Sequence, residues 1–273
     1  MNQSILTWFS NIFKKLKSTE NLQLSSDLHP RERSRLEKLP RNTKTSTIVY
    51  DHLIELSDPY WFLHTFDEII HNEIYKFKVA DNKPKIIDCG ANIGLSIIYF
   101  KYLYPEARIT GFEPDPDIFE MLKRNLQSCD HADINLYNCA VWSKNTTLSF
   151  QPDGSVGGRV VNDSSKKSVI KVEAVRLRDF LDEPLDFLKI DIEGSEYQVL
   201  RDCGDRLNNI QNLFVEYHGG VHDSHDLHDV LRIISSAGFR YHIKESWPIN
   251  HPFIKDTRRS TYYSLLNIFA YRR

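Results

Sequence analysis

The sequence "KIIDCGANIGLSIIYF", from Lys85 to Phe100, has the clearest structural pattern in the chain. Apolar, β-branched residues are followed by an aspartate, by two glycines four positions apart and by a second apolar run. Buried strands of parallel sheets have this composition, and glycine turns that lead into a helix commonly hold nucleotides. The sequence therefore predicts a strand, a ligand-binding turn and a helix here.

The same alternation of an apolar strand, a turn and a helix repeats towards the C-terminus. We expect strands in "RITGFEP", "INLYNCAVW", "PLDFLKIDIEG" and "NLFVEYHGG", and helices in "DPDIFEMLKRNLQSC", "SEYQVLRDC" and "HDLHDVLRIISSAG". The last two segments, "FRYHIKE" and "SLLNIFAYRR", have no helix between them, so we expect them to pair antiparallel at one edge. The alternation predicts an α/β fold with a seven-stranded, mostly parallel sheet and helices on both faces.

The chain divides into two expected parts. Residues 1–82 form a mainly helical N-terminal extension with a small hairpin in "TIVYDHLIELSD", after which Asp58 and Pro59 are expected to begin a helix. Residues 83–273 form the ligand-binding domain. Within it, residues 143–176 are an insertion with strand-like ends and a loop-like middle. Insertions of this length are usually functional, so we expect a lid over the substrate.

Composition indicates a soluble globular protein of the cytoplasm. The chain of 273 residues is 41% hydrophobic and 26% charged, with a net charge of −2 that gives no bulk attraction to nucleic acid. Its four cysteines form no CxxC pair and are expected to be reduced. Residues 4–17 read as an amphipathic helix. It either packs on its own domain or a partner subunit of a homo-oligomer, or lies on a membrane surface.

The glycine turn indicates which nucleotide binds. A dinucleotide fingerprint needs three glycines, whereas only Gly90 and Gly94 are present here. Asp88 at the strand end would repel a pyrophosphate and would suit a cation. S-adenosylmethionine carries an ammonium and a sulfonium and has no phosphate. We therefore favour this cofactor and disfavour an NAD-dependent oxidoreductase.

Glu113 is the second expected anchor of the cofactor. It ends the second strand, and an acid about 20 residues beyond the glycine turn accepts hydrogen bonds from ribose hydroxyls. Either acid alone could simply cap a helix or turn. Together, on consecutive strand ends with the turn between them, they indicate a nucleotide site.

These motifs resemble the FkbM-type family of S-adenosylmethionine-dependent methyltransferases. The resemblance rests on "IIDCGANIGLSIIYFKYLYP", "FEPDPDIFEMLKRNL", "CAVW", "DGSVGGR", "LKIDIEGSEYQVL" and "LNIFAYRR", from about Glu73 to the C-terminus. It implies a Rossmann-like class I methyltransferase that methylates a hydroxyl of a sugar, glycolipid or natural product. It also implies a cofactor site formed by Tyr75, Asp88, Gly90, Asn92, Gly94, Glu113, Pro114, Ala140 and Asp191.

Catalytic candidates follow the fourth and fifth strands. Asp191 and Glu193 come after the fourth strand, while Glu216 and His218 lie two apart on the fifth and thus share a side of the sheet. We expect His218 to be the general base, with Asp191 and Glu193 positioning the acceptor and Glu216 beside them. Two alternatives stay open: Asp191, Glu216 and His218 hold a divalent cation, or the acids only cap a helix. No metal ligand set is assigned.

Acceptor binding is expected from the insertion. Gly158 and Arg159 end the flexible "DGSVGGR", and Arg159 could clamp a carboxylate or phosphate, although a plain hairpin loop is the alternative. Glu196 is expected to contact the acceptor as well. We do not expect a zinc site in this region. The spacing of its histidines matches no standard zinc-binding pattern; they are His218, His222, His225 and His228.

The sequence thus predicts an O-methyltransferase with a small-molecule or glycan acceptor. The alternatives are an inactive S-adenosylmethionine-binding scaffold and a methyltransferase for an amine or protein acceptor. A nucleic-acid acceptor is disfavoured by the lack of a basic surface.

Overall fold

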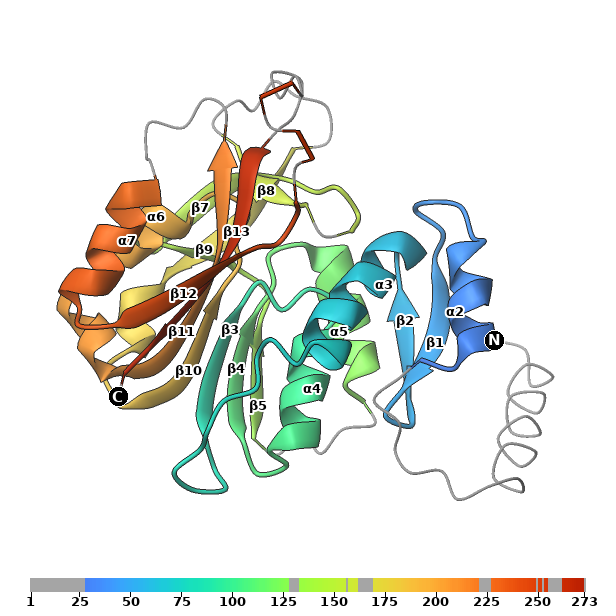
Figure 1. Ribbon diagram of the computed structural model, residues 1–273, viewed down its shortest axis with the longest axis horizontal. Coiled ribbons are helices and arrows are strands. Elements are labelled where there is room, and N and C mark those ends of the chain that lie inside the picture. The colour runs from blue at the N-terminus through green and yellow to red at the C-terminus, as the bar shows by residue number, and fades with distance from the viewer. Residues whose placement is uncertain are drawn as a thin grey trace.

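The computed structural model describes residues 28–127, 133–155, 157–161, 169–220, 227–248, 250–251, 253–254 and 262–272. Its centre is a seven-stranded sheet with the order β12-β13-β11-β10-β3-β4-β5 (Figure 1). Its strands are β3 (Lys85–Cys89), β4 (Arg108–Phe112), β5 (Ile134–Tyr137), β10 (Leu185–Ile190), β11 (Ile210–Gly220), β12 (Arg240–Glu245) and β13 (Tyr262–Tyr271). Only the two pairs made by β13 are antiparallel. The expected fold and the antiparallel edge are therefore confirmed.

Helices cover both faces of this sheet. On one face lie α4 (Leu95–Leu103) and α5 (Pro116–Asn125), and on the other lie α6 (Glu196–Cys203) and α7 (Leu227–Ser236) (Figure 1). Successive residues of β3 point to opposite faces, so Ile86 belongs to the core under α4 and α5, whereas Ile87 belongs to the core under α6 and α7. This two-sided burial explains why the strand sequences are continuous apolar runs.

A second, four-stranded sheet has the order β6-β9-β7-β8. It contains β6 (Ala140–Trp142), β7 (Thr146–Gln151), β8 (Arg159–Val160) and β9 (Ile170–Arg176). The prediction of one strand over "INLYNCAVW" is wrong, because the chain leaves the main sheet at Asn138. The Asn138 amide donates to the Glu113 carbonyl oxygen at 2.9 Å and fixes this break at the end of β4. The insertion at 143–176 is thus largely sheet in its described part; its middle, 162–168, lies outside the described residues.

The N-terminal elements are fixed against the main sheet. They are α2 (Pro30–Glu37), the hairpin β1 (Thr45–Val49) and β2 (His52–Leu56), α3 (Pro59–Phe66) and the π-helical turn η1 (Asp67–His71). As expected, the Asp58 carboxylate caps α3 by accepting from two of its backbone N–H groups. At the end of α5, the Asn125 side chain accepts from the Glu55 N–H at 2.7 Å and donates to the Glu55 carbonyl at 2.9 Å. Apolar residues of the hairpin and of α3 join the core of α4 and α5.

Short 3₁₀ turns, η2 (Leu177–Phe180) and η3 (Gly204–Asn209), complete the described elements. In the described part of the chain no helix combines the length and apolar character needed to cross a membrane. Cys89, Cys139 and Cys203 are buried free thiols. The amphipathic helix predicted over residues 4–17 lies outside the described residues.

Candidate active site

A cavity of about 310 Å³ opens at the carboxyl ends of β3, β4, β10 and β11. In open α/β sheets this is where ligands bind. Its volume lies in the range of small-molecule sites. Many of the residues predicted from the sequence line it: Tyr75, Gly90, Asn92, Glu113, Pro114, Ala140, Gly158, Asp191, Glu193, Glu216 and His218. The structure therefore unites the expected cofactor and catalytic groups in one place.

The glycine turn and Glu113 form one side of this cavity. Gly90 has a φ of +87°, and a Cβ atom there would lie 2.0 Å from the Asp191 carbonyl oxygen, so only glycine fits. The Glu113 carboxylate accepts from the backbone N–H of Asn92 at 3.0 Å and from that of Asp115 at 2.8 Å. Burial raises the pKa of Glu113 to about 8. The turn thus holds this carboxylate in a fixed orientation.

Asp88 does not face the cavity, which corrects the role expected for it. It is fully buried, and the register of β3 and β10 sets Lys189 beside it. The Lys189 ammonium lies 3.2 Å from an oxygen of Asp88 and 3.2 Å from one of Asp191, and donates to the Gly90 carbonyl at 2.8 Å. Asp88 is thus charge-matched inside the protein and cannot select a cationic nucleotide. Gly94, also expected at the cofactor, does not line the cavity; a Cβ there would meet a Leu122 methyl at 2.6 Å.

Lys189 is a site residue that the sequence analysis missed. A signal was available, because lysine is almost never buried without a partner and this one interrupts the apolar strand "FLKI". Its side chain is 3% exposed. It ties the end of β3, the glycine turn and the end of β10 together.

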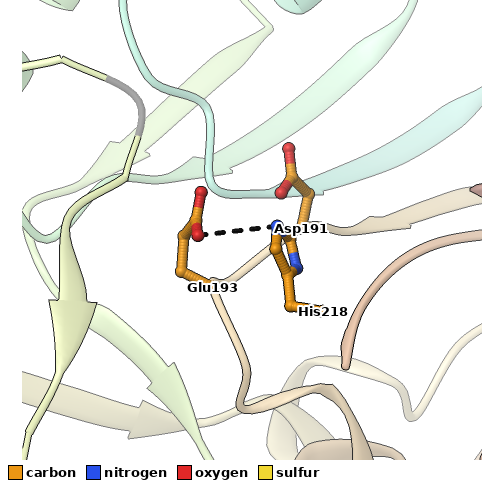
Figure 2. A group of neighbouring side chains, drawn as sticks. All are labelled: Asp191, Glu193 and His218. Carbon is orange, nitrogen blue, oxygen red and sulfur yellow. Dashed lines mark ion pairs between the residues drawn. The ribbon is translucent and has the colours of Figure 1, made fainter. Parts of the chain in front are cut away.

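His218, near the end of β11, lies between two glutamates. Figure 2 shows one of them, Glu193, together with Asp191. Its Nε2 is 3.5 Å from a carboxylate oxygen of Glu193, and its Nδ1 is 3.0 Å from one of Glu196. Glu193 adopts a left-handed conformation with a φ of 56°, which is uncommon outside glycine and concentrates at functional sites. The same Glu196 oxygen accepts from the backbone N–H of Gly194 at 3.0 Å. The Glu193 turn and the imidazole are thus locked to each other.

These carboxylates set the charge of His218. Burial by itself would lower the pKa of His218, but the negative charges of Glu193 and Glu196 outweigh it and raise the pKa well above its usual value. The ring is therefore an imidazolium at neutral pH. A general base must be unprotonated, so this environment does not suit the role expected for His218.

Two further acids, Glu216 and Glu68, line the cavity. The Glu216 carboxylate accepts from the Ser246 hydroxyl at 2.6 Å, and Glu68 of η1 accepts from the Asn267 amide at 3.3 Å. Burial, followed by the negative charge of Asp191, raises the pKa of Glu216 to about 8 and that of Glu68 to about 7. Carboxylates with such pKa values can exchange protons near neutral pH. Glu68 and Ser246 were not identified from the sequence, since only the fold brings them here.

One group of side chains among the described residues has the proximity to hold a cation. Ligand atoms of Asp191, Glu193 and His218 all lie within 4.8 Å of one another (Figure 2). The ligand set proposed from the sequence as an alternative contained Glu216 in place of Glu193. The Glu216 carboxylate is instead bonded to Ser246.

Two residues that were expected to contact the acceptor, Arg159 and Glu196, are not among the described residues that line the cavity. Arg159 does not line it, because side chains alternate along β8 and Val160 points inward instead. Glu196 is 2% exposed and lies beneath His218, so it positions the imidazole rather than meeting a substrate. The glycine-rich segment contacts the expected cofactor turn, since the Asn92 amide donates to the Ser155 carbonyl at 2.9 Å.

The strand order, with an antiparallel β13 beside β11 and a site at the strand ends, defines a Rossmann-like class I methyltransferase. Residues 88–241, more than half of the chain, match the Methyltransferase FkbM domain, and the chain belongs to this family. The resemblance inferred from the sequence is confirmed.

Three relatives illustrate the family. "Methyltransferase 1" of Beauveria bassiana is 30% identical over 180 residues, 55% of this chain and 72% of that protein. "Hexuronic acid methyltransferase AglP" of Haloferax volcanii is 27% identical over 58% of this chain and 64% of its own length. "2-O-methyltransferase NoeI" of Sinorhizobium fredii is 26% identical over 54% and 68%, respectively.

Proposed function

We propose that this protein transfers the methyl group of S-adenosylmethionine to a hydroxyl of a sugar, glycolipid or natural product. The observation that carries the proposal is the convergence of a fixed Glu113 and an acidic strand-end cluster on one cavity. The names of the relatives AglP and NoeI, which denote a sugar acid and O-methylation, support this acceptor class.

The residues of the turn fit the cofactor. The glycine turn gives a backbone cradle that a Cβ at Gly90 would fill, and Glu113 can accept from ribose hydroxyls. Pro114 and Ala140 would line the nucleoside side, and Tyr75 and Asp191 the opposite wall. When bound, S-adenosylmethionine supplies a methyl group on a cationic sulfur for in-line displacement.

The acidic strand ends would align the acceptor and take its proton. Glu216 replaces His218 as our candidate for the proton acceptor, because a carboxyl group with a pKa of about 8 keeps an ionised fraction near neutral pH, whereas the carboxylates around His218 hold its ring in the protonated form. Asp191 and Glu193 would hold the acceptor hydroxyl in line. Charged His218 would keep Glu193 in place through the contact at 3.5 Å.

A divalent cation held by Asp191, Glu193 and His218 is a second candidate for activating the hydroxyl. It is favoured by the mutual proximity of their ligand atoms and by Glu196, which orients His218 from behind. Because only a neutral imidazole can bind a metal, the cation would have to displace the proton that His218 carries in its absence. A chelator distinguishes this cation from Glu216 as the group that activates the hydroxyl, because it removes activity only if the cation is required.

Calorimetric titration with S-adenosylmethionine and with NAD tests the proposal. Wild type should bind only the former, and Glu113→Ala should bind it about 100-fold more weakly, since the hydrogen bonds to two ribose hydroxyls are lost. Glu120→Ala, an exposed acid of α5, is the matched control and should bind like wild type. Tritium transfer from labelled cofactor to a panel of hydroxylated, amine and protein acceptors, with and without EDTA, completes the test.

The possible results separate the alternatives. Binding of NAD, or indifference to Glu113→Ala, would contradict the cofactor site. Binding without transfer to any acceptor would indicate a scaffold, and transfer only to amines or proteins would refute the hydroxyl acceptor. We expect EDTA to leave transfer unchanged.

A further inference from the structure

Three aromatic rings line the cavity on the side away from Glu113. They belong to Trp61 and His64 of α3 and to Trp247, which follows β12. The ring centroids of Trp61 and Trp247 are 6.0 Å apart, and those of His64 and Trp247 are 5.3 Å apart. We call Trp61, His64 and Trp247 the aromatic wall. Trp247 remains 37% exposed, so its ring is available to a ligand.

The aromatic wall is held in place by polar contacts at both ends. The Arg41 guanidinium lies 5.4 Å from the Trp61 ring centre and is bonded at 2.7 Å to Asp58, the residue that caps α3. Ser246, the neighbour of Trp247, bonds to Glu216 at 2.6 Å. The wall is thus tied directly to our candidate proton acceptor.

Hydrogen-bonding groups accompany the rings. Trp61, His64 and Glu68 are spaced three and four residues apart, so they share one side of the helix. The Glu68 carboxylate lines the cavity; one oxygen accepts from the Asn267 amide at 3.3 Å, and the other lies 3.5 Å from His64 Nδ1. The remaining lone pairs of this carboxylate can accept from hydroxyls of a ligand. An apolar platform with an acceptor at its edge suits a ring that has a C–H face and a rim of hydroxyls.

The charges on this side of the cavity disfavour an anionic ligand. Among the described lining residues the only lysine or arginine is Lys189, and its ammonium is already shared between Asp88 and Asp191. The acids near the wall are Asp58, Glu68, Asp191, Glu193 and Glu216. Arg41 is bonded to Asp58, and charged His218 is paired with Glu193 and Glu196. A carboxylate or phosphate on the ligand would therefore have to compete with these acids for a cation.

We infer that the aromatic wall binds an uncharged saccharide ring, stacked on Trp61 and Trp247 with one hydroxyl directed to Glu216. The inference rests on the proposed function, which requires an acceptor hydroxyl, and it narrows the acceptor to neutral sugars. The strand order supports the placement, because Glu113 follows β4 whereas Trp247 follows β12, and four strands separate these two in the sheet.

The test is a glycan array probed with the full chain in the presence of S-adenosylhomocysteine. It carries matched pairs, such as glucosides and the corresponding glucuronides, which differ in one carboxylate, together with amino sugars. Wild type should be retained on neutral glycans and about tenfold less on their uronate partners. Trp61→Ala and Trp247→Ala should each weaken retention about tenfold, and Trp61→Phe should restore part of it.

Two controls make the result interpretable. Tyr241→Ala removes an aromatic side chain of β12 that is 40% exposed and does not line the cavity, so it should behave like wild type. Calorimetry on the same preparations should show unchanged affinity for S-adenosylmethionine in the Trp61 and Trp247 variants.

Other outcomes would overturn the inference. These are equal or better retention on uronates, retention only on amino sugars, no retention on any glycan, and retention unaffected by both alanine variants. Loss of cofactor affinity in the Trp variants would show that the wall holds the nucleoside instead. If wild type binds cofactor and methylates a non-sugar alcohol, the inference fails while the proposed function stands; if it binds no cofactor, the proposed function itself fails.

Discussion

His218 illustrates how a few contacts decide the chemistry of one side chain. A histidine near a cofactor is a common general base, but here its two ring nitrogens face Glu196 at 3.0 Å and Glu193 at 3.5 Å. Both carboxylates stabilise the protonated ring. We therefore treat His218 as a positioning cation.

Replacing Glu196 by Gln tests this assignment. The amide can still accept from the Gly194 N–H, so Glu196→Gln removes the charge while preserving the local hydrogen bond. The pKa of His218, followed by NMR titration of the ring, should fall by at least about one pH unit. Glu193→Gln should also lower the pKa of His218. If the pKa of His218 is unchanged in both variants, the two carboxylates do not keep the ring protonated. His218 would then again be a candidate for the general base.

The turn between β3 and α4 shows how an element can depend on its neighbour. Gly90 needs both a positive φ and close approach to the end of β10, where the Asp191 carbonyl would collide with any Cβ. Lys189 closes the same contact by donating to the Gly90 carbonyl. The cofactor turn is thus shaped by two strands together.

Gly90→Ala should lower the free energy of unfolding by about 3 kcal/mol or more, since the backbone of two strands must move apart. Gly154→Ala is the matched control, because Gly154 also has a positive φ of 75° but has no atom within 4 Å of an added Cβ. There only backbone strain of about 1–2 kcal/mol is expected. Urea unfolding of both variants measures the difference. Equal losses would show that contact with β10 is unimportant.

The whole molecule concentrates buried acids around one cavity. Burial raises the pKa of Glu113 and Glu216 to about 8 and that of Glu68 to about 7. Each of these groups holds a proton in the folded state that the unfolded chain releases near pH 4.5. Folding therefore becomes less favourable as the pH rises through the window between these values.

We expect the free energy of unfolding to fall from pH 5 to pH 8, measured by urea denaturation without ligand. His218 acts in the same direction, because its raised pKa gives stability that is lost as the ring deprotonates. Glu113→Gln should make the decline shallower, because one of the titrating groups is removed. Stability that is flat or rises over this range would contradict the burial of these acids.

Much of the fold could be predicted from local sequence patterns. Apolar runs that alternate with capped helices specified the parallel sheet, and the missing helix before "SLLNIFAYRR" specified its antiparallel edge. Glu113, Asp191 and His218 were recognised as site residues because acids and histidine directly follow, or lie in, predicted strands. These features depend on neighbours along the chain, which the sequence displays.

The remaining features depend on which strands become neighbours in space. Asp88 does not contact the cofactor cavity as expected, because the register of β3 and β10 pairs it with Lys189. The chain leaves the main sheet at Asn138. Trp61 of α3 and Trp247 lie in contact although most of the sequence separates them. The charge of His218 and the pKa of Glu216 follow from burial and from carboxylates on other elements. The one-dimensional pattern names the groups, but only their packing fixes the distances and the local dielectric on which their protonation depends.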